Sequence, residues 1–495
     1  MVKMLSFSVF LLCLWILFKN NKIFTHPIRL LFFLSLAVFV IISIFNTTSL
    51  SNTILILSVS SLMLAVSGFI LDLLNTNRFS QIMMSAVAVV CAFYIEKTFH
   101  FADYSKININ NYDPKGEVFL EIDQKLYPEV EKIIKNMDLD LKRGFFPDSE
   151  KITGLDDYFV VDLGQTTNVN SFILKMNKVK GVKWVEPNEN IPFESPEKII
   201  ADNMPSLNSL SNDPSVVMQW HLAFLDMEKY YQYFKTNNIK PQRVAKLYIL
   251  DTGIDGRHED LPSVTGINTD KQGHGTHCAG VAAAITNNKI GVASMAPDRG
   301  WIDVKGIQVI GDVGFGTQKS IIDGIIKAAD SGADVISMSL GGITNQEREK
   351  AYNDAIRYAN VKGVIVVVAA GNANLDGRRY SPANAENVIT VASVNEKTEK
   401  SGFSNSVQNL KMGISAPGER ILSTTPSNTY TAYNGTSMAT PQVAGLIAVM
   451  KAINPSLDTK TVYKIISETG SETQNTTRTG KLIQPYKVIL SLTGK

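Results

Sequence analysis

The stretch VAKLYILDTG, Val244 to Gly253, joins an apolar run to an acid, a threonine and a glycine. Such a run suits a strand that is buried on both faces of a parallel sheet, with Asp251 at its carboxyl end. Apolar runs of the same kind recur at 301–309, 333–340, 363–372 and 388–394, with helical patterns at 320–332 and 349–363. This alternation predicts an α/β fold with a doubly wound, mostly parallel sheet.

Polar residues fall at the carboxyl ends of these strands, which is where open α/β sheets place their ligand sites. They are Asp251, Ser339 and Asn372. Because parallel strands end at the same edge of a sheet, this edge is the predicted site.

Two motifs place candidate reactive side chains near the starts of helices. GHGTHCAG, Gly273 to Gly280, sets His274 just ahead of a helix, and YNGTSMATPQVAG, Tyr433 to Gly445, sets Ser437 ahead of an apolar one. A serine in that place lies in the field of free backbone N–H groups, where developing negative charge is favoured. Taken alone, the motif also suits a serine that only caps a buried helix, with Pro441 tolerated in the first turn.

Acyl transfer by a serine needs a base near neutral pKa, a group that holds and stabilises that base, and donors for an oxyanion. Ser437, His274, Asp251 and Asn372 supply these functions, in the chain order acid, histidine, serine. The motif around Ser437 lacks the second glycine of a nucleophile elbow, which argues against an α/β-hydrolase. His274 and His277 lack the Glu of an H-E-x-x-H pattern, which argues against a zinc metalloprotease.

These motifs resemble those of the subtilisin-like serine proteases, the subtilases. LDTGIDGRHEDL, GHGTHCAG, SLGG, AAGN and GTSMATPQVAG match the family in order and spacing, and the match covers roughly Val217 to the C-terminus. The resemblance implies a serine endopeptidase with Asp251, His274 and Ser437 as its catalytic triad. It implies an oxyanion hole formed by Asn372 and the backbone N–H of Ser437.

The resemblance also implies a substrate groove and a role for the cysteine near the base. One side of the groove pairs with the peptide as an added strand, and the other completes the P1 pocket. The two sides are Ser339, Leu340 and Gly341, and Ala369, Ala370 and Gly371. Cys278, beside His277, resembles the cysteine of one subtilase subgroup, and we expect it to pack rather than to react.

A structural calcium ion is implied as well, although the chemistry itself requires no cofactor. A residue-by-residue match to the tight calcium site of the family selects the side chains of Gln219, Asp260 and Asn288 and the carbonyl oxygens of Thr286, Ile290 and Val292. Oxygen ligands from acids, amides and carbonyls suit Ca²⁺. The alternative interpretation of this loop is an ordinary Asn-Asn turn.

The composition sets the broad class of the protein. A chain of 495 residues suggests about three domains, and 45% hydrophobic with 19% charged residues leaves ample material for a core. The formal net charge is +2, and no basic run is interleaved with aromatic residues, so we do not expect nucleic acid as a partner. Two of the three cysteines lie in apolar N-terminal segments, so we expect no disulfide framework and a free thiol at Cys278.

Apolar stretches at 4–18, 28–45, 53–71 and 79–95 predict three or four membrane spans within residues 1–97. The first stretch also suits a signal-peptide core, but no small-residue cleavage site follows it, which favours a retained span. Its following loop is the most basic, and the second loop is uncharged. The positive-inside rule then places the chain after Glu96 outside the cytoplasm.

Residues 98–192, with a core at 117–192, have the pattern strand, helix, strand, strand, helix, strand of a ferredoxin-like unit. This region, especially VKGVKWVEPNENI, resembles the inhibitory propeptide of subtilases, which packs on the protease, assists its folding and lays its tail across the active site. Residues 193–216 are rich in Pro, Ser and Asn and form a predicted exposed linker with a processing site. The predicted peptidase domain is 217–495.

The sequence therefore predicts a membrane-anchored subtilase whose catalytic domain faces the exocytoplasmic side and whose partners are polypeptide substrates, its own propeptide and the lipid bilayer. Because the anchor precedes the propeptide, self-cleavage in the linker would sever the catalytic domain from the membrane segment. That domain would then be shed or stay docked on the anchored propeptide. The alternative is a catalytically silent membrane scaffold or sensor that binds peptides without cutting them.

Overall fold

The computed structural model describes residues 116–164, 168–192, 197–199, 210–262, 265–266, 269–344 and 349–494. The membrane spans predicted within residues 1–97 lie outside these ranges. In the part of the chain that is described, no helix is both long enough and apolar enough to cross a membrane. The described residues belong to one compact unit.

The N-terminal part of this unit is a small α+β domain with the predicted order of strands and helices. Its antiparallel sheet has the order β2-β3-β1-β4. The elements are β1 (Glu117–Ile122), α5 (Tyr127–Lys135), β2 (Lys142–Arg143), β3 (Tyr158–Asp162), α6 (Val169–Met176) and β4 (Val182–Pro187). The second strand of the predicted pattern is reduced to the two residues of β2, because the chain then leaves the sheet and buries Phe145 against Tyr158 and Phe119.

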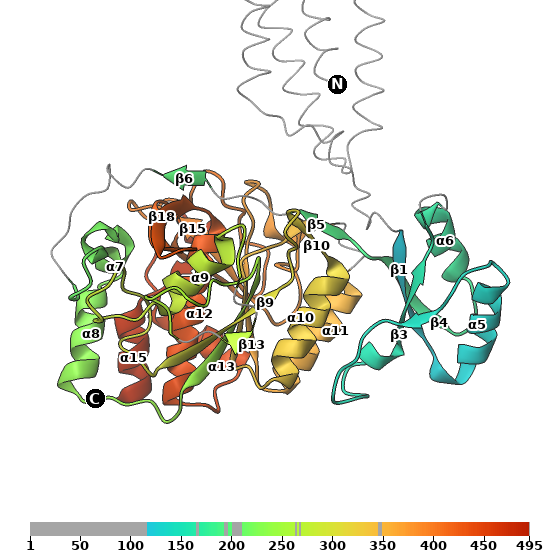
Figure 1. Ribbon diagram of the computed structural model, residues 1–495, viewed down its shortest axis with the longest axis horizontal. Coiled ribbons are helices and arrows are strands. Elements are labelled where there is room, and N and C mark those ends of the chain that lie inside the picture. Colours follow the sequence, from blue (N-terminus) through green and yellow to red (C-terminus); the bar gives the residue numbers. More distant parts are fainter. Residues whose placement is uncertain are drawn as a thin grey trace, which may run out of the picture. The chain divides into compact units, whose positions relative to one another are not determined.

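Both faces of this small sheet are buried. Along β1, Val118 and Leu120 pack with residues of α5 and α6, whereas Phe119 packs into a core that includes residues of α10 (Gln318–Asp330) and α11 (Lys350–Val361). This alternation follows from the two-residue period of a strand. The small domain therefore docks on the helices of the larger domain through the face of its sheet (Figure 1).

The larger domain is built on an eight-stranded sheet with the order β19-β16-β15-β13-β11-β7-β9-β8. The strands are β7 (Ala245–Asp251), β8 (Thr265–Gly266), β9 (Ile302–Gln308), β11 (Val335–Met338), β13 (Ile365–Ala369), β15 (Ile389–Val394), β16 (Gly413–Pro417) and β19 (Lys481–Leu482). Every pairing between neighbours is parallel, as predicted. The strand order reverses at β7, which pairs with β9 on one side and β11 on the other.

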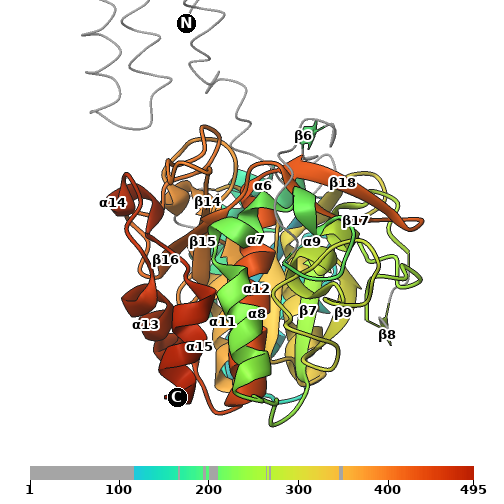
Figure 2. The ribbon, with the colours of Figure 1, turned by 90° about the vertical axis from the view of Figure 1, so that its left-hand side faces the viewer.

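Helices cover both faces of this sheet. Leu247 and Ile249 of β7 pack with α9 (His274–Ala283) and α12 (Thr436–Ile453), whereas Tyr248 and Leu250 pack with α10 and α11. Figures 1 and 2 show α12 between the sheet and the outer helices α8 (Met227–Thr236) and α15 (Pro485–Thr493). α12 is apolar on every side because it is buried on every side.

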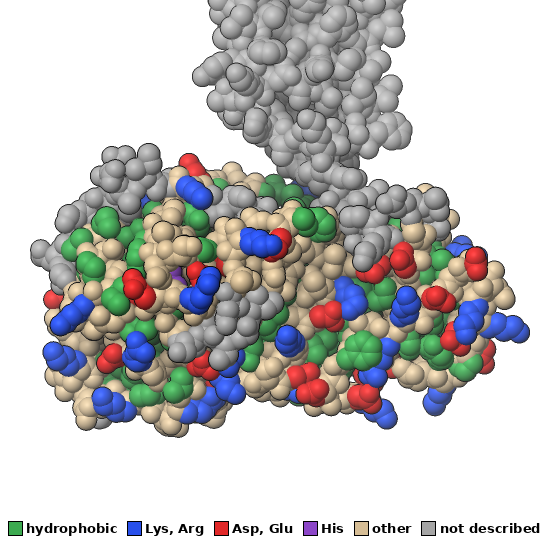
Figure 3. Space-filling model, viewed as in Figure 1, with side chains coloured by type: hydrophobic (Ala, Val, Ile, Leu, Met, Phe, Trp, Pro, Cys, Tyr) green, Lys and Arg blue, Asp and Glu red, His purple; other side chains and the backbone are tan. Residues whose placement is uncertain are grey.

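The surface carries charges of both signs in mixture. On the face that Figure 3 shows, Lys and Arg side chains are interspersed with Asp and Glu over the described residues. On this face the two signs are mixed and do not gather into separate patches.

Candidate active site

Two of the predicted catalytic residues form a buried pair at the reversal point of the sheet. Asp251 is the last residue of β7, and His274 is the first residue of α9. The Nδ1 atom of His274 lies 2.7 Å from Oδ1 of Asp251, and both side chains are almost completely buried. Burial disfavours the imidazolium ion, but the Asp251 carboxylate outweighs it and raises the pKa of His274 well above its usual value. The carboxylate thus holds the Nδ1 proton and leaves Nε2 as the basic atom.

Glycines allow the helix that carries His274 to lie directly against the end of β7. A Cβ atom on Gly275 would lie 2.0 Å from the carbonyl oxygen of Gly253, which is closer than any side chain can approach. Gly253 itself has a φ of +111°, and a Cβ there would meet the carbonyl oxygen of Thr269 at 2.2 Å. The glycines of the DTG and GHGTH motifs therefore set the position of the base.

Asp270 supports the pair, although sequence analysis did not select it. Its buried carboxylate accepts hydrogen bonds from Gly273 N, from Thr276 N and Oγ1, and from Thr252 Oγ1 at 2.7–2.9 Å. Asp270 thereby ties the start of α9 to the residue after Asp251. The sequence does carry a signal for Asp270, since an acid shortly before a helix often accepts hydrogen bonds from the free N–H groups of the first turn.

Ser437 lies in the first turn of α12, but it does not cap the helix. The N-cap residue is Gly435, and Thr436 and Ser437 are the first helical residues. The Ser437 hydroxyl donates a hydrogen bond of 3.1 Å to the carbonyl oxygen of Ser339, which follows β11. The interpretation of Ser437 as a cap is therefore wrong, and its hydroxyl lies at the carboxyl edge of the sheet.

Pro441 lies one turn inside α12, and not in its first turn as the sequence suggested. Without an N–H group, Pro441 cannot bond to the carbonyl oxygen of Ser437 four residues earlier. That oxygen instead accepts hydrogen bonds from Ser339 Oγ at 2.8 Å and from Cys278 Sγ at 3.5 Å. The proline thus lets two side chains of neighbouring elements hold the backbone of the serine.

Cys278 has the packing position expected of it. Its sulfur lies 3.9 Å from Nδ1 of His274, and burial raises the pKa of the thiol above its usual value, which keeps it protonated. His277, the residue before Cys278, has its Nε2 atom at hydrogen-bond distance from the carbonyl oxygens of Ile421 and Thr431. Burial lowers the pKa of His277 to about 3, so its ring is neutral and serves to join α9 to the backbone of residues 421 and 431.

Asn372 is oriented by the residue before the serine. Its Oδ1 accepts hydrogen bonds of 2.9 Å from both the backbone N–H and the hydroxyl of Thr436. This fixes the amide plane and turns the NH₂ group away from Thr436. Because Asn372 and Ser437 line the same pocket, the amide is positioned as a donor to an oxygen bound there.

The predicted groove residues gather around this pocket with one exception. The lining residues are Pro192, Ile310, Ser339, Leu340, Gly341, Ala369, Gly371, Asn372, Tyr380, Thr436 and Ser437. Ala370 is not among them, because its side chain points to the opposite side of the strand and packs with Ala392 and Val407. The alternation of side chains along an extended chain explains why only one of two neighbours reaches the groove.

Tyr380 is a groove residue that sequence analysis missed. A Cβ atom on Gly341 or on Gly371 would lie 2.7 Å from the ring of Tyr380, so the ring lies against both walls of the pocket. It is only 3% exposed. No motif marks this residue, since it reaches the pocket through β14 (Tyr380–Ser381), which pairs with β12 (Gly342–Ile343) behind the wall.

The end of the small domain reaches the same pocket. β5 (Asn190–Pro192) pairs with β10 (Phe315–Thr317), and Pro192 lies opposite Phe315 and lines the pocket with Ser437. Just before β5, Glu186 accepts hydrogen bonds from Gln318 Nε2 at 2.9 Å and from Ala351 N at 3.2 Å, at the first turns of α10 and α11.

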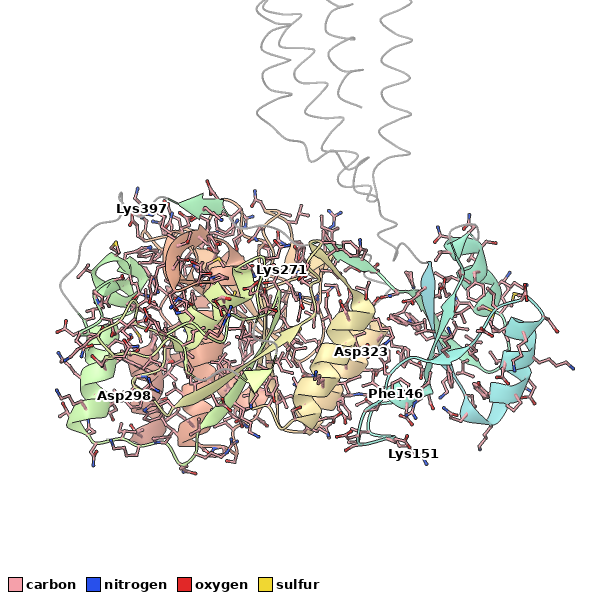
Figure 4. The ribbon with its side chains drawn as sticks, in the orientation of Figure 1. Phe146, Lys151, Lys271, Asp298, Asp323 and Lys397 are labelled. Carbon is pink, nitrogen blue, oxygen red and sulfur yellow. The ribbon has the colours of Figure 1, made fainter. Side chains whose placement is uncertain are left out.

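A loop of the small domain adds a second contact with these helices. Ser149 N donates to the hydroxyl of Tyr358 on α11 at 3.2 Å, and Asp148 N donates to Asp330 at the end of α10. Figure 4 shows Phe146 and Lys151 on this loop and Asp323 on the neighbouring α10. Strand pairing, helix capping and loop contacts thus anchor the small domain along one side of the larger domain.

The predicted calcium loop gathers some of its expected ligands and one that was not expected. Asp260 accepts hydrogen bonds from Asn288 Nδ2 and Val292 N at 2.8 Å. Asp213 accepts the backbone N–H groups of Asn288 and Lys289 in the same loop. Burial and the charge of Asp213 outweigh the hydrogen bonds that Asp260 accepts and raise its pKa to about 7.

Gln219 does not join this loop site. Its Oε1 accepts the N–H of Ala293 at 2.8 Å, and its Nε2 donates to the carbonyl oxygens of Ala293 and Leu422. These bonds direct the Gln219 amide to Ala293 and Leu422, whereas Asp213 contacts residues 287–289 of the predicted loop. Two buried carboxylates, an amide and loop carbonyls fit a calcium ion, which would offset the repulsion between the two acids.

Comparisons with known proteins find related sequences and structures. A sequence profile described as the subtilase family matches residues 243–481. Thermitase of Thermoactinomyces vulgaris is 39% identical over 241 residues, which cover 44% of this chain and 83% of thermitase. Subtilisin DY of Bacillus licheniformis is 39% identical over 238 residues, which cover 46% of this chain and 84% of that protein.

The likeness extends to solved structures. Fervidolysin of Fervidobacterium pennivorans, a keratinolytic enzyme related to subtilisin, matches with a TM-score of 0.61 at 24% identity. The match covers 76% of this chain and 61% of fervidolysin. Fold and sequence together define a serine protease with the subtilisin-like fold. The chain belongs to the subtilase family, whose members are serine endopeptidases.

Proposed function

We propose that the chain is a membrane-associated serine endopeptidase that processes itself and uses Asp251, His274 and Ser437 as its triad. The observation that carries the proposal is the buried Asp251–His274 pair of 2.7 Å, together with a pocket that both Ser437 and Asn372 line. Its substrates are polypeptides, as for other subtilases.

In the acylation step, Oγ of Ser437 attacks the carbonyl carbon of the scissile bond while Nε2 of His274 takes the hydroxyl proton. Asn372 and the backbone N–H of Ser437 donate to the resulting oxyanion, and one such side-chain donor contributes about 2.7–4 kcal/mol to transition-state stabilisation. The C–N bond then breaks, and His274 returns the proton to the leaving amine.

Deacylation repeats the proton transfers with water as the nucleophile. His274 takes a proton from water as the oxygen attacks the acyl carbon, and the ester bond to Ser437 breaks. The serine recovers its proton, and the new carboxylate product leaves. Asp251 keeps the Nδ1–H of His274 in place and stabilises the imidazolium in both steps.

We infer that the small domain is an inhibitory propeptide and that processing occurs in the linker after Pro192. Its docking on α10 and α11 and the pairing of β5 with β10 support this role, because an added strand presents a peptide to a groove through backbone hydrogen bonds.

We further propose that the segment before residue 98 holds the protein in the membrane with the catalytic domain on the exocytoplasmic side. The apolar stretches and the charges of their loops support this orientation. A calcium ion held by Asp213, Asp260 and Asn288, with carbonyl oxygens of Thr286, Ile290 and Val292, would supply structural stability and no chemistry.

Intact mass and N-terminal sequencing of the wild type and of Ser437→Ala, each from membrane and soluble fractions, test this function. We expect a wild-type fragment that begins between Pro192 and Val217 and that is absent in the variant. A serine-reactive phosphonate should label the wild type only. Neither fragment nor labelling in the wild type would favour the alternative, a scaffold that binds peptides without cutting them.

A further inference from the structure

A second segment of the linker lies on the other side of the catalytic serine. β6 (Glu197–Ile199) pairs antiparallel with β18 (Thr429–Asn434), so that Glu197 lies opposite Asn434 and Lys198 opposite Tyr433. Asn434 Nδ2 donates a hydrogen bond of 2.7 Å to Oε2 of Glu197. Figures 1 and 2 both show β6 beside β18.

β18 leads directly into the catalytic serine, because only Gly435 and Thr436 separate Asn434 from Ser437. β17 (Ile421–Thr425) pairs with the opposite edge of β18. β6 therefore fills the remaining edge of a small antiparallel sheet at the catalytic serine. An extended peptide that pairs with this edge gains the same backbone hydrogen bonds that β6 makes.

The direction of the chain determines which side of a substrate each strand resembles. Pro192, at the end of β5, lines the pocket with Ser437 and precedes Glu197 by only four intervening residues. Five extended steps reach at most about 17 Å. β5 thus occupies the side where the acyl part of a substrate binds, and β6 occupies the side of the leaving amine.

A cut between β5 and β6 leaves the two strands on different fragments. β5 belongs to the small domain and leaves with it, whereas β6 stays covalently joined to the larger domain through residues 200–209. The far end of this tether is fixed near Asp213, whose carboxylate accepts hydrogen bonds from the backbone N–H groups of residues 287–289 in the larger domain. A tether this short gives an effective concentration on the order of 1 mM, so the strand stays bound if its intrinsic dissociation constant lies below that value.

We propose that β6 is a second inhibitory strand, which remains on β18 after self-processing and competes with the part of a peptide substrate that follows the scissile bond. The proposal rests on the proposed self-processing protease function. The enzyme then hydrolyses substrates with little chain after the scissile bond freely and is slowed on substrates with an extended chain there.

The test compares two substrates on the protein that results when the full chain is expressed and processes itself. A coumarin amide carries residues only before the scissile bond, whereas a quenched peptide has the same residues before it and five or so after it. The variant Lys198→Pro/Ile199→Pro removes two successive N–H groups, and one of these must point at β18 because the groups alternate sides. The matched control is Lys198→Ala/Ile199→Ala, which keeps the backbone donors.

We expect the proline variant to raise kcat/KM for the quenched peptide about tenfold relative to the coumarin amide, and the alanine control to leave this ratio unchanged. Glu197→Ala, which removes only the bond to Asn434, should raise the ratio about threefold and covers the case in which the proline variant does not fold. The N-terminus of the wild-type fragment should lie between residues 193 and 197.

Equal ratios in the wild type and in the variants that hydrolyse the coumarin amide would overturn the proposal, as would a mature N-terminus beyond Ile199. In either case the coumarin amide is still hydrolysed, so the protease function stands. Loss of coumarin amide hydrolysis and of phosphonate labelling in the wild type would instead overturn the protease function, and this inference with it.

Discussion

Two buried acidic sites of the larger domain differ in what faces the carboxylate. Asp251 faces the imidazole of His274 across 2.7 Å, whereas Asp260 lies in a loop site that also holds the carboxylate of Asp213. A carboxylate with a titratable base as its partner can stabilise a charge that appears during a reaction. Two neighbouring carboxylates repel and favour a bound cation. In the proposed function the first site serves chemistry and the second serves stability.

The largest effect should follow from Asp251→Asn, which keeps the shape of the side chain but removes its charge and its role as acceptor for the Nδ1 proton of His274. We expect kcat to fall about 10⁴-fold. Hydrolysis of the coumarin amide measures it, and the melting temperature of the same sample should respond to calcium as in the wild type. If kcat fell less than tenfold, Asp251 would not have the catalytic role that distinguishes its site from the loop site.

Asn372→Ala should come next, because it removes one oxyanion donor and leaves the triad in place. We expect kcat to fall about 10²- to 10³-fold with KM nearly unchanged. Steady-state kinetics on the same amide separate the two constants. A rise in KM with constant kcat would show that Asn372 serves ground-state binding instead.

At the loop site, Asp213→Asn should change stability and not rate. With calcium at 100 times its dissociation constant, the ion stabilises the fold by about 2.7 kcal/mol, and the variant should lose this gain. Melting curves with calcium or with a chelator measure it, and the exposed Asp298→Asn is the matched control. Equal calcium responses in both variants would exclude Asp213 as a ligand.

Tyr380→Ala should have a moderate effect on selectivity, because the ring lies against Gly341 and Gly371 in the pocket. Opening this space should shift the ratio of kcat/KM for a Phe over an Ala residue before the scissile bond by about tenfold towards Phe. Tyr380→Phe keeps the ring and should behave as the wild type. An unchanged ratio in Tyr380→Ala would place the ring outside the substrate path.

The smallest effect concerns the pH profile. The pKa of His274 is raised by Asp251, and the base must be neutral, so activity should be lost as the pH falls through a value above the usual histidine pKa of about 6.5. In Asp251→Asn the residual activity should persist to lower pH, because burial then dominates. The pH dependence of kcat/KM is measured for the wild type and for Asp251→Asn. If both proteins lost activity at the same pH on the acid side, the electrostatic role of Asp251 would be contradicted.

Sequence analysis succeeded where a residue stands at the end of a strand or the start of a helix. Asp251 and Asn372 follow apolar runs, and the parallel pairing of β7, β11 and β13 brings such ends together without further information. It did not select Asp213 for the 287–289 loop, because Gln219 and Asp213 lie only a few residues apart in an irregular segment and their sequence does not show which one faces the loop.

Pattern and spacing in the chain determined the α/β fold, the small ferredoxin-like domain, and the acid, histidine, serine and asparagine of the site, because periodicity and glycine-bearing motifs encode them locally. Only the tertiary structure decided that Asp270 supports the base, that Ser339 and Cys278 hold the serine carbonyl that Pro441 leaves without its helical partner, and that Tyr380 narrows the pocket. These contacts join residues distant in the chain, and only the packing of the elements brings them together.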